Sequence, residues 1–165
     1  MIPTATADAS TTAQKAPATK PDGRQTAEKV ARSFIVGWTT FIPWDFDPAE
    51  DWFDRWEQWA TPEFIGQMQT SVGQRWAWTW NEQKKAFDTR VENVDGTWLN
   101  ADRTTAVARV TVSRLVLGML QGADESETQT LTYDVWMSVD NGTPPLVFAV
   151  HQTAPDAPAP AGANE

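Results

Sequence analysis

Apolar residues recur at intervals of three and four along residues 26–42, TAEKVARSFIVGWTTFI. The apolar positions of this segment are Ala27, Val30, Ala31, Phe34, Ile35, Trp38, Phe41 and Ile42. The polar residues Glu28, Lys29, Arg32 and Ser33 fall on the opposite side. This spacing predicts an amphipathic helix of about 15 residues. Pro43 limits its end, because proline lacks the N–H that a helix interior uses.

Two further helices are indicated by capping residues followed by proline. Asp47 precedes Pro48, and Thr61 precedes Pro62. An aspartate or threonine side chain can accept a hydrogen bond from the first helical turn, and proline suits that turn. Glu50 lies three residues after Asp47, where a capping-box partner is expected. We therefore expect one helix to begin at residue 48 and another at residue 62.

Tryptophan marks the second of these helices, AEDWFDRWEQWA. Trp52, Trp56 and Trp59 stand at i, i+4 and i+7, so that the three indoles share one face. Because this is the only apolar face of the helix, we expect it to lie in the core. The third helix is expected to reach at least Val72. The following run from Trp76 to Trp80 fits helix and strand spacing equally well.

From residue 87 onward the apolar period changes to two, which is typical of strands. Four strands are expected, at Phe87–Val94, Thr104–Leu117, around Leu131–Val139 and at Leu146–Gln152. They are joined by a turn at Asp95-Gly96, a loop Gly118–Glu127 and a turn at 141–144. Short turns between long strands predict an antiparallel meander. Helices ahead of a four-stranded sheet can bury their apolar faces only against it, so the predicted class is α+β.

The two ends of the chain are rich in Ala, Thr and Pro and poor in large apolar side chains. Such segments bury too little apolar surface to offset the entropy lost on ordering. We expect residues 1–25 to be a disordered stalk, residues 26–154 to form the α+β domain, and residues 155–165 to be a disordered tail. A Pro/Ala/Thr stalk suits a domain held away from a membrane or wall, and a dispensable terminus remains the alternative.

The charge of the chain excludes two classes of partner. The formal net charge is -9 and the pI is about 4.5, which is unsuited to nucleic acid or to direct binding of anionic lipid. The absence of cysteine removes disulfides, thiolate nucleophiles and cysteine-ligated zinc. No apolar run reaches the roughly 18 residues needed to span a bilayer. The acidic stretch from Asp45 to Glu57 lacks the spacing of a calcium loop, so we expect no metal and no cofactor.

The opening AEKVARSFIVGW, then WATPEFIGQMQ and the alternating strands, resembles a known family of domains. The pattern is similar to the nuclear-transport-factor-two-like, or cystatin-like, fold, in which helices pack inside a curved four-stranded antiparallel sheet. Within that fold it resembles the extracytoplasmic domains of actinobacterial Mce-associated proteins and of the conjugation protein TcpC, which are similar to VirB-type assembly factors of type IV secretion. The resemblance implies a non-enzymatic assembly domain of an envelope-spanning machine. Its place would be the extracytoplasmic face of the cytoplasmic membrane, through an anchor absent from this chain, with a cytoplasmic location left open.

Three tryptophans break the local apolar pattern and are the expected partner surface. These are Trp44, Trp78 and Trp136. Exposed aromatic side chains usually mark interfaces, and the expected partners are protein subunits of a membrane-associated machine or a second copy of this chain. Val107, Arg109 and Thr111 would form an outer sheet face, suited to pairing or to water.

The alternative function is a small-ligand-binding or isomerase-like pocket protein of the same fold. Its pocket candidates are Tyr133, Asp134 and His151, the last being the single histidine of the chain. Neighbouring residues of a strand point to opposite faces, so Tyr133 and Asp134 are not expected to share one pocket.

Overall fold

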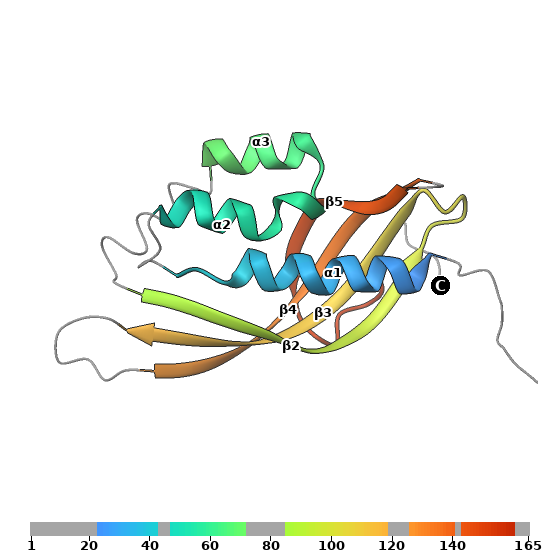
Figure 1. The fold of residues 1–165 in the computed structure, drawn as a ribbon. Coiled ribbons are helices and arrows are strands. Elements are labelled where there is room, and N and C mark those ends of the chain that lie inside the picture. The colour runs from blue at the N-terminus through green and yellow to red at the C-terminus, as the bar shows by residue number, and fades with distance from the viewer. Residues whose placement is uncertain (1–22, 43–46, 72–84, 119–125, 141–142, 161–165) are drawn as a thin grey trace, which may run out of the picture.

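The computed structural model describes residues 23–42, 47–71, 85–118, 126–140 and 143–160. Figure 1 shows α1 lying along one face of a curved sheet, with α2 and α3 stacked further out. The helix α1 contacts β2, β3 and β5, whereas α2 contacts α1. These contacts confirm the predicted α+β class and the helical layer on one face of the sheet.

The first helix, α1 (Arg24–Thr39), begins two residues before the segment predicted from the apolar pattern. It starts after Gly23, whose φ of 94° is left-handed and favours glycine. Its buried face carries the predicted apolar residues, Ala27, Val30, Ala31, Phe34 and Ile35. At its other end the Thr89 hydroxyl donates to the Thr39 carbonyl at 3.1 Å, which ties α1 to β2.

The caps of the next two helices are confirmed. The N–H of Glu50 donates to Asp47 Oδ1 at 3.1 Å at the start of α2 (Pro48–Trp56). The N–H of Phe64 donates to Thr61 Oγ1 at 3.2 Å at the start of α3 (Pro62–Ser71). A 3-10 turn, η1 (Glu57–Trp59), joins the two helices. Val72 and the run from Trp76 to Trp80 lie outside the described residues.

The sheet is the predicted antiparallel meander, with the strand order β2-β3-β4-β5. Its strands are β2 (Lys85–Leu99), β3 (Thr105–Gly118), β4 (Ser126–Asp140) and β5 (Thr143–Thr153). The described residues contain a short bridge on each outer strand: Phe41 pairs with Phe87 of β2, and Ala60 pairs with Val147 of β5.

The predicted turn at Asp95-Gly96 was wrong. The strand β2 continues through both residues, with a register shift between Val94 and Gly96, and ends at Leu99. The chain reverses at residues 100–104, where Asn100 Oδ1 accepts from the N–H groups of Thr104 and Thr105. An Asp-Gly pair suits a β-bulge as well as a turn. Beyond this bulge, β2 continues to pair with β3, as Trp98 does with Val107.

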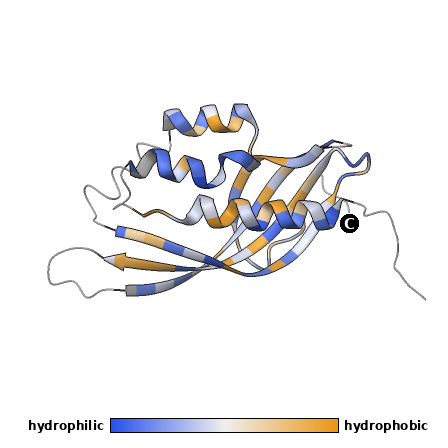
Figure 2. Ribbon diagram, viewed as in Figure 1, coloured by the Kyte–Doolittle hydropathy of each residue, from blue (hydrophilic) through white to orange (hydrophobic). Residues whose placement is uncertain are grey.

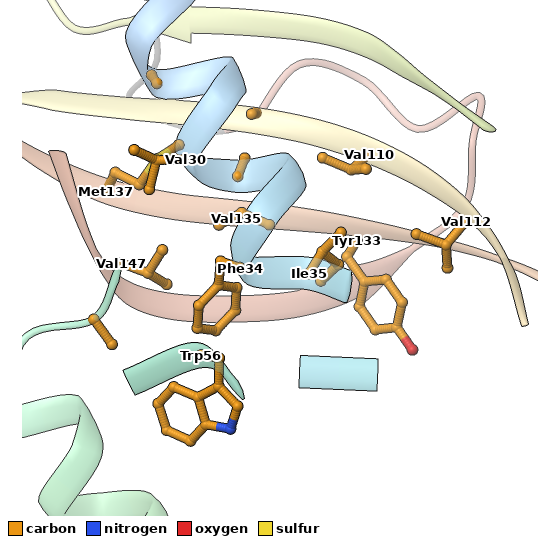
Figure 3. Packing of buried hydrophobic residues seen from close by; sticks show 14 of the residues in the cluster. Val30, Phe34, Ile35, Trp56, Val110, Val112, Tyr133, Val135, Met137 and Val147 are labelled. Carbon is orange, nitrogen blue, oxygen red and sulfur yellow. The ribbon is translucent and has the colours of Figure 1, made fainter. Parts of the chain in front are cut away.

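The core lies between α1 and the sheet, with an aromatic extension towards α2. Figure 3 shows Ile35 of α1 beside Tyr133 of β4, and Phe34 of α1 turned towards Trp56 of α2. Figure 2 shows hydrophobic residues on both α1 and the strands that it crosses. Both Trp52 and Trp56 are fully buried, as predicted, whereas Trp59 is half-buried and packs against the core. The indole N–H of Trp52 donates to the Trp38 carbonyl at 2.9 Å, which fastens α2 to α1.

Candidate functional site

The structure separates the three pocket candidates into two layers. Tyr133 lies in the core beneath the helices, and its burial raises the pKa of its hydroxyl. Asp134 is turned to the other face of the sheet, so the two residues point in opposite directions, as predicted. His151 is the cross-strand neighbour of Asp134 in β5 and is exposed. The outer face therefore brings together Asp134 and His151 but leaves Tyr133 on the inner face.

The strongest polar arrangement on the outer face is centred on Arg109. Arg109 Nε donates to Asp134 Oδ1 at 2.8 Å, and Nη2 donates to Oδ2 at 3.0 Å. The same guanidinium donates to the carbonyls of Ala157 and Pro158, and it lies 5.3 Å from the centre of the Trp98 ring. The hydrogen bond to Asp134 raises the pKa of Arg109. This bidentate pair is a structural element, since its groups are already hydrogen-bonded to each other.

The outer face of β3 differs from its predicted role. Val107, Arg109 and Thr111 are buried, rather than open to water or to another strand. The Thr111 hydroxyl lies 2.9 Å from that of Thr132, and the residues that follow β5 place their carbonyls against Arg109. The division of the chain at residue 155 stays a prediction, although these contacts show that the described chain continues along the domain beyond Thr153.

The predicted tryptophan interface is described only in part. Trp44 and Trp78 lie outside the described residues. Trp136 is half-buried on β4, where it faces Val107 on one side and Ala149 on the other. Its role in partner binding stays a prediction.

An exposed aromatic residue that the sequence analysis missed lies on β5. Phe148 is 40% exposed and stands at a bulge, because Val147 pairs with Met137 and Ala149 pairs with Trp136. It borders a pocket of about 390 Å³ together with Thr61, Phe64 and Gln67. The sequence feature that could have revealed it is the segment LVFAV. Five consecutive apolar residues in a strand place apolar side chains on both faces of the sheet, not only on the buried face.

A second missed feature is a groove between α1, η1 and β2. We call it the arginine groove; it has a volume of about 680 Å³ and is lined by Arg32, Val36, Thr40, Arg55, Trp59, Val91 and a few neighbours. These residues come from segments distant in sequence, so no local pattern marks them. Among the described residues no cluster of His, Cys, Asp and Glu could hold a metal ion. No helix in the same part of the chain is long and apolar enough to cross a membrane.

Comparisons with known proteins show what this geometry is similar to. No family model matches the chain, and no curated protein sequence matches it. Solved structures do match. A homolog of VirB8 from Helicobacter pylori, CagV, aligns with a TM-score of 0.58 and 8% identity, over 78% of this chain and 97% of that one.

Two other solved structures align over similar lengths of this chain. An IcmL-like type IV secretion system protein from Legionella pneumophila has a TM-score of 0.57 and 12% identity, over 84% of this chain and 97% of that one. An Ntf2-like protein involved in plasmid conjugation has a TM-score of 0.55 and 14% identity, over 82% of this chain and 50% of that one. At these identities the likeness concerns the fold. The chain therefore has the nuclear-transport-factor-two-like fold.

Proposed function

We propose that this protein is a non-enzymatic protein–protein assembly domain of an envelope-spanning machine, either a conjugation or type IV secretion system or an Mce-type transporter. The proposed location is the extracytoplasmic face of the cytoplasmic membrane. The names of the similar structures support the proposal, because they include a conjugation protein and two type IV secretion proteins. Since one fold serves many functions, the proposal depends on surface features of this chain.

The observation that carries the proposal is the exposure of Phe148 on β5, an edge strand of the sheet. A large aromatic side chain at 40% exposure leaves apolar surface in water, and aromatic residues are enriched in protein interfaces relative to the rest of the surface. The bulge at Phe148 turns its side chain out of the alternation of β5. The adjoining pocket, with buried Phe64 among its lining residues, offers a recess in which an apolar side chain of a partner would fit.

The charge around Phe148 indicates the kind of partner that would fit there. Glu63 lines the same pocket and is exposed, and it is the one charged side chain among the described residues that line it. Complementary charge guides the approach of partners and selects among them. The surface suits a protein subunit that presents an apolar side chain with a basic side chain beside it.

The non-enzymatic part of the proposal is supported by the filling of the space between helices and sheet. An enzyme of this fold would need an acid or base in that space. The described side chains of the hydrophobic cluster that fills it are apolar or aromatic, as Ile35, Val135 and Met137 illustrate (Figure 3), and Tyr133, which keeps its proton to higher pH, is the one titratable member of that cluster. Asp134 and His151 belong to the opposite face.

A pull-down from detergent-solubilised membranes of the native host tests this function. The tagged protein, its Phe148→Ser variant and its Leu115→Ser variant would be compared, with captured proteins identified and quantified by mass spectrometry. Leu115 is a matched control, because it is 37% exposed and lies on β3 rather than on β5. We expect secretion or transport subunits to be captured, and Phe148→Ser alone to lose them. Capture of no such subunit, or equal loss in both variants, would contradict the proposal.

A further inference from the structure

We propose that the arginine groove binds a small amphiphile that has an apolar body and a carboxylate head. This site is separate from the surface around Phe148, and it does not depend on the assembly function. The residues that carry the argument are Arg32, Val36, Thr40, Trp59, Arg90 and Val91.

The size and walls of the groove suit a small apolar body. Its volume of about 680 Å³ falls within the range typical of ligand sites, roughly 300–1,000 Å³. Val36 of α1, Trp59 of η1 and Val91 of β2 contribute apolar walls from three different elements. The close approach of α1 and α2 shapes the groove, because a Cβ atom on Gly37 would lie 2.4 Å from the Arg55 carbonyl oxygen.

The charge of the groove is opposite to that of the protein. Three arginines line it, Arg32, Arg55 and Arg90, and none of the described lining residues is acidic. The whole chain, in contrast, has 22 acidic and 13 basic residues. An arginine guanidinium matches a carboxylate in shape and can donate two parallel hydrogen bonds to it. Positive charge concentrated here therefore favours one small anion rather than a general interaction with polyanions.

The present partners of two of these arginines are exchangeable. Arg32 Nε lies 3.6 Å from Glu28 Oε1, and Arg90 Nε lies 2.9 Å from Glu92 Oε2. These pairs are solvated: the Arg90 side chain is 81% exposed and that of Arg32 is 46% exposed. Exposed ion pairs contribute little stability. A ligand carboxylate in the groove can therefore replace Glu28 beside Arg32 at small cost, while the exposed Arg90 adds positive charge at the rim of the groove.

A buried hydroxyl provides independent support for a ligand. Thr40 is only 6% exposed and lines the groove, and its Oγ1 has no hydrogen-bond partner among the described residues. Buried polar groups are nearly always hydrogen-bonded, and those that are not call for an explanation. A ligand carboxylate oxygen at the end of the groove would accept a hydrogen bond from this hydroxyl.

Isothermal titration calorimetry of the full chain with octanoate tests the proposal, with 1-octanol as the neutral ligand of equal chain length. We expect saturable binding of one octanoate per chain, weaker binding of octanol, and weakening of octanoate binding by salt. The Arg32→Gln/Arg90→Gln double variant should weaken octanoate binding about tenfold, and Thr40→Val about fivefold. Thr40→Val should leave the denaturation midpoint unchanged or raised, since it removes an unpaired buried hydroxyl.

Arg103→Gln is the matched control, because Arg103 is exposed in the turn between β2 and β3 and does not line the groove. Octanoate should bind this variant as it binds the unchanged protein. The proposal is overturned by any of three results: no saturable octanoate binding, equal affinity for octanol, or equal weakening by Arg103→Gln and by the groove variants. These outcomes are independent of the capture of protein partners.

Discussion

Arg109 donates from Nε and Nη2 to both carboxylate oxygens of Asp134, at 2.8 and 3.0 Å, with only 4% of its own side chain exposed. The two residues face each other across β3 and β4, on the side of the sheet opposite the helices. The remaining hydrogen bonds of the guanidinium go to the carbonyls of Ala157 and Pro158, so the pair also holds the chain beyond β5.

Replacing Arg109 with alanine is expected to lower the free energy of unfolding by about 3–5 kcal/mol, because Asp134 would remain buried without a counter-charge. Chemical denaturation measures the change. Arg90→Ala is the control from the same sheet, since the exposed pair of Arg90 with Glu92 should contribute less than about 1 kcal/mol. Equal losses in the two variants would show that the burial of Asp134 is not the cause.

Ending the chain after Thr153 is expected to destabilise the protein by about 2–3 kcal/mol, because Arg109 loses two carbonyl acceptors. A chain ending after Pro160 keeps both carbonyls and should unfold at the same denaturant concentration as the full chain. Urea unfolding followed by tryptophan fluorescence compares the three proteins. An unchanged midpoint in the shorter chain would show that these contacts add no stability.

The two buried indoles of α2 are expected to respond differently to replacement by phenylalanine. The N–H of Trp52 donates to the Trp38 carbonyl, whereas the buried N–H of Trp56 has no hydrogen-bond partner in the described part of the chain. Trp52→Phe removes a hydrogen bond and leaves a carbonyl unpaired, so it should cost about 1 kcal/mol more than Trp56→Phe. Both changes remove similar apolar volume, and thermal unfolding of the two variants measures the difference. The reverse order would contradict the assigned hydrogen bond.

A methyl group at Gly37 is expected to force α1 and α2 apart. The Cβ of Gly37→Ala would lie 2.4 Å from the Arg55 carbonyl oxygen, and crowding of this kind costs about 1–3 kcal/mol. Gly66 is the control, because it is exposed in α3 and nothing lies within 4 Å of the position that a Cβ atom would take there. Gly66→Ala should raise stability by about 0.5–1 kcal/mol through lower chain entropy in the unfolded state. Denaturation curves that fail to separate the two variants would refute the close helix contact.

Tyr133 provides a pH-dependent test, since it is the single tyrosine of the chain. Burial raises its pKa, while the nearby Arg114 guanidinium partly opposes this. The unfolded chain ionises near pH 10, whereas folded Tyr133 keeps its proton to higher pH. Folding stability contributed by this group is therefore complete below about pH 10 and is lost as the pH rises through the folded pKa. Phenolate absorbance should appear at higher pH in the folded protein than in denaturant, and Tyr133→Phe should remove the signal.

Much of the fold followed from local chemistry. The caps at Asp47 and Thr61 were predicted because a side-chain acceptor and a following proline act within a single turn. The alternation along β4 predicted that Tyr133 and Asp134 would point to opposite faces. The turn at Asp95-Gly96 was wrong because a bulge uses the same residue types, and only the pairing with β3 distinguishes the two.

The sequence by itself determined the helices, the antiparallel order and the apolar core, because each depends on periodicity and on contacts between near neighbours. Only the tertiary structure decided the exposure of Phe148, the burial of Arg109 and the arginine groove. The exposure of a side chain depends on which distant segments lie over it, and the groove joins α1, η1 and β2. No local sequence pattern encodes these contacts between distant segments, because they form only when the helices pack on the sheet.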